Sequence, residues 1–202
     1  MTAKIYQNEL FPKMERVFAE LEVKNEWAAF SGRIHQYSPR IDLAIGPFNV
    51  EGPNLNHIYD ELVEDEHIRH FLLLCFKYHK ENLNAQVYDE IIHPEFETII
   101  HKNKNARCFI AIEIENQNSK KHIMGSVVNA ASLGRVGIGV AFNESTLRSF
   151  CRIANYLAFL KRVEKNTYDT YNFMILTVDQ LESIYQDVVH KFPESILANR
   201  VE

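Results

Sequence analysis

Hydrophobic residues near the start of the chain recur every three or four positions, which is the spacing of an amphipathic helix. The pattern runs from Asn8 to Phe30, and Pro12 suits a first turn because this turn leaves backbone N–H groups unpaired anyway. A second helical pattern covers residues 57–82, where acidic side chains come first and favour the positive end of the helix. Both segments are expected to pack one apolar face against a core.

Other segments alternate apolar and polar residues, or form short apolar runs, as strands do. Strands are predicted at residues 40–45, 48–50, 108–115, 135–142 and 173–178. The Gly46-Pro47 turn separates the first two, and a helix rich in small residues stops at Gly134. Two more helices follow, the last with Asp179 as N-cap and Glu182 three residues later. Because crossover helices cover both faces of a sheet, this order predicts an α/β sandwich with a mixed central β-sheet flanked by helices.

The composition fits one domain over residues 1–202, with a helical insertion at about 55–92. With 202 residues, of which 46% are hydrophobic, the chain can bury a sizeable core. Cys75, Cys108 and Cys151 lie in apolar stretches without C-x-x-C spacing, so they are expected to be reduced core residues. No apolar stretch approaches the roughly 20 residues that span a bilayer, and the first residues do not resemble a signal peptide. A cytoplasmic protein without membrane contact is expected.

Two carboxylates end the predicted strand CFIAIEIE at residues 108–115. Strand periodicity places Glu113 and Glu115 on one face, together with Phe109 and Ala111. Burying such acids unpaired costs several kcal/mol each, and their mutual repulsion raises the pKa of at least one of them. A third acid, Asp42, lies on the polar side of strand 40–45. If the two strands are neighbours, the three acids converge on a site for Mg²⁺ or Mn²⁺, because these hard ions prefer oxygen ligands.

This set of acids resembles the motif of the PD-(D/E)XK nuclease superfamily, the restriction-endonuclease-like fold. The first half of the motif is read in the segment that ends at Asp42, and the second half is Glu113-Ile114-Glu115. The core of that family runs helix, three strands, helix, strand, and the resemblance covers roughly residues 8–142. It implies a magnesium-dependent endonuclease that hydrolyses phosphodiester bonds of DNA, with Asp42, Glu113 and Glu115 as metal ligands and catalytic residues. It also adds a homodimer as an expectation.

In one respect the chain departs from the family, because Glu115 stands where a lysine is usual. The resemblance then makes Lys120 or Lys121, in the following helix, the catalytic cation, with Lys121 preferred. Basic residues before the same strand are candidates for phosphate contacts: Lys102, Lys104 and Arg107. The net charge of −5 argues against broad, non-specific binding of polyanions.

Several alternatives stay open at the level of the sequence. The two glutamates fit a solvent-exposed strand end, or ion pairs with Lys120 and Arg135. Asp42, next to Arg40, fits a turn or a salt bridge. His67 and His70, one helical turn apart, are a weaker metal candidate than packing or surface residues. The whole chain equally fits a noncatalytic binding or assembly module that keeps the nuclease fold, or a hydrolase of another phosphate ester.

Overall fold

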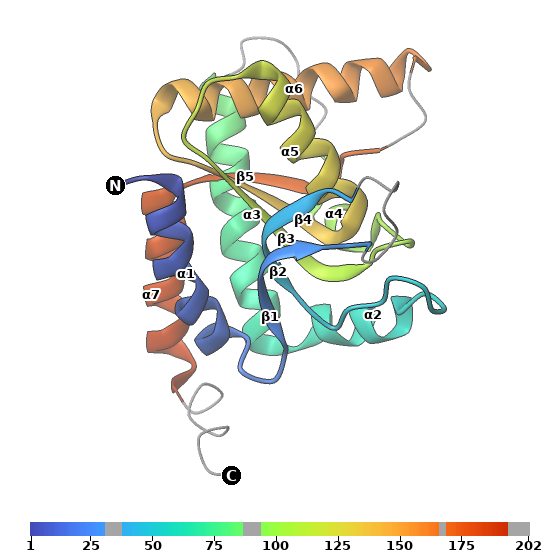
Figure 1. The fold of residues 1–202 in the computed structure, drawn as a ribbon, viewed down its shortest axis with the longest axis vertical. Coiled ribbons are helices and arrows are strands. Elements are labelled where there is room, and N and C mark those ends of the chain that lie inside the picture. Colours follow the sequence, from blue (N-terminus) through green and yellow to red (C-terminus); the bar gives the residue numbers. More distant parts are fainter. Residues whose placement is uncertain (31–37, 87–93, 166–168, 194–202) are drawn as a thin grey trace.

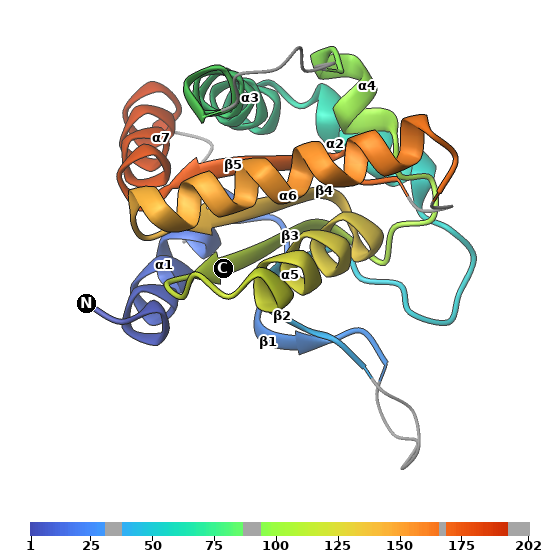
Figure 2. The same cartoon turned by 90° about the horizontal axis from the view of Figure 1, so that it is seen from above.

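The computed structural model describes residues 1–30, 38–86, 94–165 and 169–193. A central sheet carries helices on both faces (Figures 1 and 2). In chain order the elements are α1 Ala3–Val17, β1 Val23–Ala28, β2 Arg40–Ile45, α2 Asn56–Glu64, α3 Glu66–Gln86, α4 Phe96–His101, β3 Cys108–Glu115, α5 Lys120–Leu133, β4 Gly134–Ala141, α6 Glu144–Arg162, β5 Phe173–Thr177 and α7 Val178–Lys191.

The sheet has five strands in the order β1-β2-β3-β4-β5 and is mixed. β2 is antiparallel to both β1 and β3, whereas β3, β4 and β5 run parallel to one another. Parallel neighbours need a crossover connection, and α5 and α6 supply the two that this sheet requires. The predicted α/β class, with a mixed central sheet flanked by helices, is confirmed.

Two clusters of buried side chains cover the two faces of the sheet. Helices α1, α3 and α7 contribute to one cluster, and α5 and α6 to the other. On the second face α5 comes very close to β4: a Cβ added at Gly137 would lie 2.9 Å from the backbone carbon of Ala130 and 3.0 Å from the nitrogen of Ala131. The small residues that the sequence places in this helix therefore let its backbone pack directly on the sheet.

The free edge of β5 is covered by side chains of α3. The N–H of Ile175 donates to Nδ1 of His79 at 3.1 Å, and Nδ2 of Asn82 donates to the carbonyl of Ile175 at 2.9 Å. His79 accepts through Nδ1, so this ring is neutral with its proton on Nε2. The α3 side chains thus replace the hydrogen bonds that a further strand would make.

The first predicted helix is too long, and it hides a strand. α1 begins at Ala3, capped by the hydroxyl of Thr2, and ends at Val17, so Pro12 lies inside the helix rather than in its first turn. The following residues form β1, in which Val23 and Trp27 are buried. A spacing of four residues suits one face of a helix and one face of a strand alike, so the pattern alone did not separate them.

Residues 57–82, predicted as one helix, form two. Asp65 has an extended backbone that ends α2. Its carboxylate accepts the N–H groups of His67 at 3.0 Å and Ile68 at 3.3 Å, so it caps the start of α3. Asp65, one of the acids taken as favouring a continuous helix, is therefore the residue at which the helix is divided. α2 and α3 lie within the predicted insertion at 55–92, of which residues 87–92 are outside the described part of the chain.

Two smaller predictions are wrong. Residues 48–50 form no strand. The N-cap of α7 is Thr177, in a capping box with Gln180, instead of Asp179 with Glu182. Both candidate caps have the right residue types, and the structure selects the one that directly follows β5.

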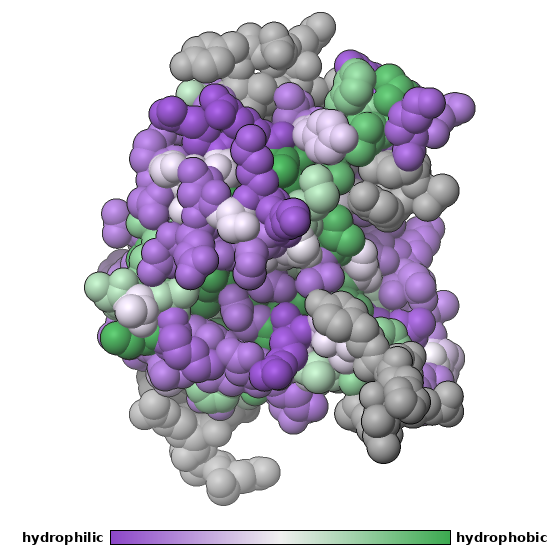
Figure 3. Space-filling model, turned by 45° about the horizontal axis from the view of Figure 1, so that its top comes forward, coloured by the Kyte–Doolittle hydropathy of each residue, from purple (hydrophilic) through white to green (hydrophobic). Residues whose placement is uncertain are grey.

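Figure 3 shows a surface that is mostly hydrophilic, with hydrophobic side chains gathered near the end of α6. Tyr156, Phe159 and Val163 are 48%, 47% and 39% exposed there, at the spacing of one helical face. The three cysteines are buried and unbridged, as predicted. None of the helices in the described ranges is both long enough and apolar enough to cross a membrane.

Replacing Gly137 by alanine is expected to lower the free energy of unfolding by about 1–3 kcal/mol, because the added Cβ meets backbone atoms of α5 that cannot rotate away. Gly125 offers a matched control in α5, since nothing lies within 4 Å of a Cβ placed there. Gly125→Ala should instead stabilise the helix by about 0.5–1 kcal/mol. Urea unfolding monitored by circular dichroism measures both; equal effects of the two substitutions would contradict the close packing.

Candidate functional site

The register between β2 and β3 brings Asp42 and Glu113 together. Leu43 pairs with Ile112, and Ala44 with Ala111, so Asp42 comes opposite Glu113 in the same register. Residues directly opposite each other on antiparallel strands project from the same face of the sheet. The two acids therefore share one side of the sheet, at the end of β3 that Figure 2 shows beside α1.

Asp42 takes the place of a backbone acceptor where β2 and β3 separate. Its Oδ2 accepts the N–H of Ile114 at 2.8 Å, two residues beyond Ile112, where the pairing of β3 with β2 ends. Burial raises the pKa of Asp42, and the Ile114 hydrogen bond partly offsets this by stabilising the charged form. Arg40 does not pair with Asp42; its guanidinium lies 3.7 Å from Glu26 instead.

Glu113 is buried among other acids. Its exposed fraction is 6%, and burial raises its pKa well above the ordinary range, followed by the repulsion of Asp42 and then of Glu115. Within the described ranges, no Lys, Arg or His forms an ion pair with Asp42, Glu113 or Glu115. An acid buried in this way needs either a proton or a bound cation.

Arg135 of β4, the other deeply buried charged residue of the sheet, has partners for its charge. Its side chain is 1% exposed and forms an ion pair with Asp60. Its guanidinium also donates to the carbonyl of Ile100, and to that of Asn103 at 3.1 Å. Arg135 therefore ties α2 and α4 to the sheet and does not pair with the glutamates of β3. The contrast singles out Glu113, whose surroundings repel its charge.

Glu115 is half-buried and has a neutral partner. Ser126 of α5 donates its hydroxyl to Oε1 of Glu115 at 2.8 Å. This contact holds the second carboxylate of β3 against the helix that follows it. Neither a purely solvated strand end nor an ion pair with Arg135 describes Glu115.

The two predicted lysines lie in the first turn of α5, close in sequence to Glu115. Lys120 and Lys121 are both exposed, with Ser119 at the N-cap position. In the part of the chain that the structure describes, neither forms an ion pair. Both lysines therefore lie near the end of β3 that carries Glu113 and Glu115, where they could contact an anion.

The other basic candidates lie at the wrong end of the strand. Arg107 precedes β3 directly, while Glu113 is near the far end, about 20 Å away at the rise of an extended strand. Lys102 is moreover engaged with Asp169 at 3.1 Å. Proximity in sequence misled here because a strand separates its two flanks by its full length.

Phe109 also departs from strict alternation. It was expected on the face of Glu113, but its ring stacks on Tyr59 in the cluster on the opposite face, with 5.9 Å between ring centroids. Cys108 packs in the cluster that includes Ala111. The alternation is therefore irregular at the start of β3 and regular toward Glu113, where the acids lie.

Three residues near the acids were not found from the sequence: Lys4, Gln7 and Glu26. Glu26 of β1 raises the pKa of both Asp42 and Glu113, although it is not the largest cause for either. Lys4 of α1 lies 2.6 Å from Glu26, and Gln7 donates to the carbonyl of Asp42. The signal that would have found Glu26 was the strand β1 itself, which the helical interpretation of residues 8–30 concealed.

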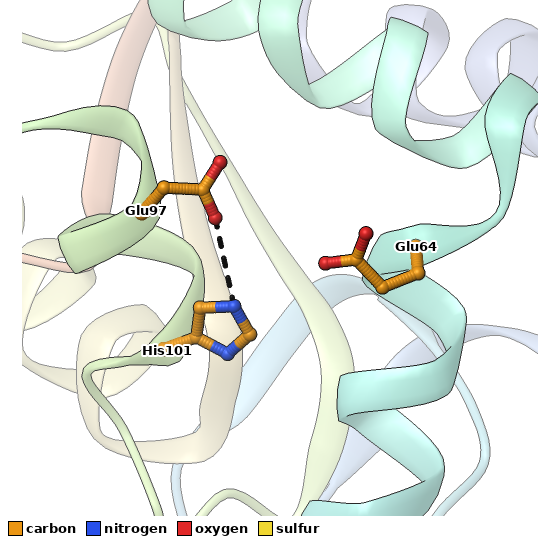
Figure 4. A group of neighbouring side chains, drawn as sticks. All are labelled: Glu64, Glu97 and His101. Atoms are coloured by element: carbon orange, nitrogen blue, oxygen red, sulfur yellow. Dashed lines mark ion pairs between the residues drawn. The ribbon is translucent and has the colours of Figure 1, made fainter.

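A different group meets the spacing of a metal site more closely. Glu64, Glu97 and His101 bring one ligand atom each within 4.8 Å of one another (Figure 4), a spacing that Asp42, Glu113 and Glu115 do not reach as a set. The group is at the surface, however, and the guanidinium of Arg69 already pairs with both Glu64 and Glu97. Internal ion pairs therefore account for this surface group.

The histidine pair that the sequence suggested does not converge. His67 lies 2.6 Å from Asp65 through Nδ1 and 3.2 Å from the carbonyl of Val17 through Nε2. His70 lies 2.6 Å from Asp187. Each ring has its own partners, so these two are packing and capping residues.

Comparisons with protein-family models, with curated proteins and with solved structures found no match to this chain.

Glu113→Gln is expected to make the metal-free protein more stable at neutral pH by about 1–2 kcal/mol. The pKa of Glu113 is higher in the folded than in the unfolded state, so its contribution is favourable below the ordinary glutamate range and is lost as the pH rises through the folded pKa. The gain should vanish near about pH 4, where the carboxyl is protonated in both states.

Chemical denaturation in the presence of a chelator, at about pH 4 and pH 7.5, measures this difference. Glu164→Gln, at an exposed position, is the control. A stability gain of Glu113→Gln that does not change with pH would contradict a buried, repelled carboxylate.

Proposed function

We propose that this protein is a metal-dependent nuclease that hydrolyses phosphodiester bonds of DNA, with a restriction-endonuclease-like fold. The observation that carries the proposal is Glu113, a buried carboxylate whose electrostatic neighbours are further carboxylates. A structural acid at this position would be expected to have a cationic partner, as Arg135 has an anionic one. A divalent cation supplies the missing positive charge.

The order of elements supports the fold assignment. Helix α1, strands β1, β2 and β3, helix α5 and strand β4 follow the helix, three strands, helix, strand core of the PD-(D/E)XK superfamily, with α2, α3 and α4 inserted between β2 and β3. Asp42 lies on the second strand, and Glu113-Ile114-Glu115 on the third. These are the strands on which the motif is expected to lie.

The donor set fits Mg²⁺ or Mn²⁺, because carboxylate oxygens suit hard divalent ions. Asp42 and Glu113 would hold the ion from opposite strands, and Glu115 would join from the half-buried end of β3. A bound ion of this kind lowers the pKa of a coordinated water and stabilises charge on a phosphodiester. Because Glu113 is buried, its interaction with any positive charge is stronger than it would be in water.

The remaining residues have positioning roles in this proposal. Ser126 fixes Oε1 of Glu115, so that Oε2 is the oxygen left for a ligand or a water. Lys120 and Lys121, in the first turn of α5, supply positive charge for a phosphate, together with the positive end of that helix. Lys121 remains the preferred cation for the chemistry, in place of the lysine that the family has where this chain has Glu115.

A noncatalytic binding or assembly module of the same fold is the second candidate. Two observations favour it: the glutamate at position 115 and the net charge of −5. Such a protein would keep the fold and the acids without hydrolysing a substrate. The two candidates differ in turnover, which an assay on DNA decides.

In that assay, the full chain with Mg²⁺ or Mn²⁺ is expected to nick or linearise supercoiled plasmid DNA, and a chelator should stop the reaction. Asp42→Asn and Glu113→Gln should each lower the rate at least about a hundredfold, since each removes a charged ligand. Lys121→Gln should lower it more than Lys77→Gln, which changes an exposed lysine of α3. Cation binding without any cleavage would favour the noncatalytic module.

Binding of the cation can be tested without a substrate. Mg²⁺ or Mn²⁺ at about a hundred times its Kd should stabilise the wild-type protein by roughly 2.7 kcal/mol, because the ion binds only the folded state. Glu113→Gln should abolish this gain, since it removes a ligand and the repulsion together. Thermal melts with chelator and with metal measure it. An equal shift in both proteins, or none in the wild type, would exclude the proposed metal centre.

A further inference from the structure

Charge is divided unevenly between the helices that cover the sheet. α5 and α6, which lie side by side on one face, carry six Lys and Arg and a single acid, Glu144 (Figure 2). The five other helices carry seven Lys and Arg against eleven Asp and Glu. A chain with a net charge of −5 therefore has one basic face, and such a face favours an anionic partner.

The basic face begins at the edge of the sheet that carries the acids of β3. Asn118, which lies between β3 and α5, donates its side-chain amide to Oγ of Ser145 in α6 at 2.8 Å. This contact joins the starts of α5 and α6. The two lysines in the first turn of α5 and Arg148 of α6 therefore lie at the edge where β3 ends with Glu113 and Glu115.

An exposed row of side chains follows α6 away from this edge. The side chain of Arg148 is 51% exposed, and Tyr156 and Phe159 are 48% and 47% exposed. Arg152 is exposed too, and it forms no ion pair within the described ranges. The guanidinium of Arg162 lies 5.7 Å from the centroid of the Phe159 ring. We call these five residues the α6 ridge, which is about 21 Å long at the rise of a helix.

The α6 ridge combines positive charge with exposed aromatic rings. A nucleic acid strand is complementary to this combination, because its phosphates are negative and its bases have flat faces that stack on aromatic side chains. In a duplex the neighbouring base pairs cover these faces, whereas in a single strand the faces are accessible. A second copy of the chain is disfavoured as the partner here, since two basic faces repel each other.

We propose that the α6 ridge binds single-stranded DNA, with phosphates against Arg148 and Arg152 and bases stacked on Tyr156 and Phe159. The choice of DNA rests on the proposed function. The inference extends that function, because it names a binding surface outside the acids and an unpaired strand as the DNA that is bound. A strand on the ridge leads toward the acids of β3, since the starts of α5 and α6 are joined at their edge of the sheet.

The experiment measures binding of fluorescein-labelled DNA to the full chain by fluorescence anisotropy, in chelator so that no metal-dependent cleavage occurs. The probes are an oligothymidylate about 12 nucleotides long, an abasic chain of equal length and a duplex of equal length. The wild type should bind the oligothymidylate at least about tenfold more tightly than the abasic chain, because only the former has bases that stack. It should bind the duplex more weakly than the oligothymidylate.

Stacking is tested by removing the two rings. The double variant with Tyr156→Ala and Phe159→Ala should bind the oligothymidylate and the abasic chain equally. Leu73→Ala, which changes an exposed apolar side chain of α3, is the matched control and should keep the wild-type preference. Circular dichroism melts of both proteins show that they fold.

The phosphate contact is tested with Arg152→Gln, because Arg148 already lies 3.8 Å from Glu144. Arg152→Gln should reduce the slope of log Kd against log salt concentration by about 0.7, the value for one phosphate of a single strand. Lys77→Gln, which removes the same charge from an exposed position of α3, should leave the slope unchanged.

Equal binding of the oligothymidylate and the abasic chain by the wild type would overturn the inference, as would tighter binding of the duplex. Equal slopes for Arg152→Gln and Lys77→Gln would overturn it too. Binding of phosphatidylserine vesicles without binding of the oligothymidylate would assign the face to a lipid surface instead.

The proposed function fails separately. If the wild type cleaves DNA with Mg²⁺ while the ridge variants bind the oligothymidylate like the wild type, only the inference is lost. If the wild type binds the oligothymidylate through the ridge but cleaves no DNA with Mg²⁺ or Mn²⁺, the inference stands and the nuclease proposal is lost.

Discussion

The backbone pairing of β2 with β3 joins two halves of the sheet that are built differently. On one side lies an antiparallel pair, β1 and β2; on the other lie three parallel strands connected by α5 and α6. Only three residue pairs, from Leu43–Ile112 to Ile45–Ile110, form this seam before the strands separate. Where they separate, the side chain of Asp42 continues the hydrogen bonding to Ile114, so an acid is part of what holds the sheet together.

The pairing of β2 with β3 brings the carboxyl groups of Asp42 and Glu113 close together, where their negative charges would repel each other. Moving a carboxylate from water into the protein interior costs several kcal/mol of desolvation free energy. Here Glu113 and Asp42 lie opposite each other on β3 and β2. The surrounding structure reduces the cost with uncharged donors: the N–H of Ile114 for Asp42 and the hydroxyl of Ser126 for Glu115. These donors hold the carboxyl groups of Asp42 and Glu115 in position. The fold thus brings together carboxyl groups whose charged forms burial disfavours, which a core built only for stability would avoid.

The sequence revealed the fold class and the acids of β2 and β3, because both depend on strong local patterns. The apolar run before Glu113 and the alternation around Asp42 mark their strands whatever the tertiary context. β1 was missed because Val23 and Trp27, four residues apart, satisfy helix and strand spacing equally. Because Glu26 lies in β1, its position near Asp42 was not predicted either. The positions of Lys102 and Arg107 were misjudged because sequence neighbours can lie at opposite ends of one strand, and no local pattern reports that length in space.

Glu26 of β1 has a φ of 49°, in the left-handed region, and this affects how the folded protein meets other chains. β1 forms one edge of the sheet, and an edge strand with a regular row of N–H and C=O groups is a template on which another chain can add a strand. At Glu26 the backbone turns out of the extended conformation, which divides that row into two short pieces. Lys24 and Glu26 add charges that an incoming strand would have to match. The distortion at Glu26 therefore makes this edge a poor seed for aggregation.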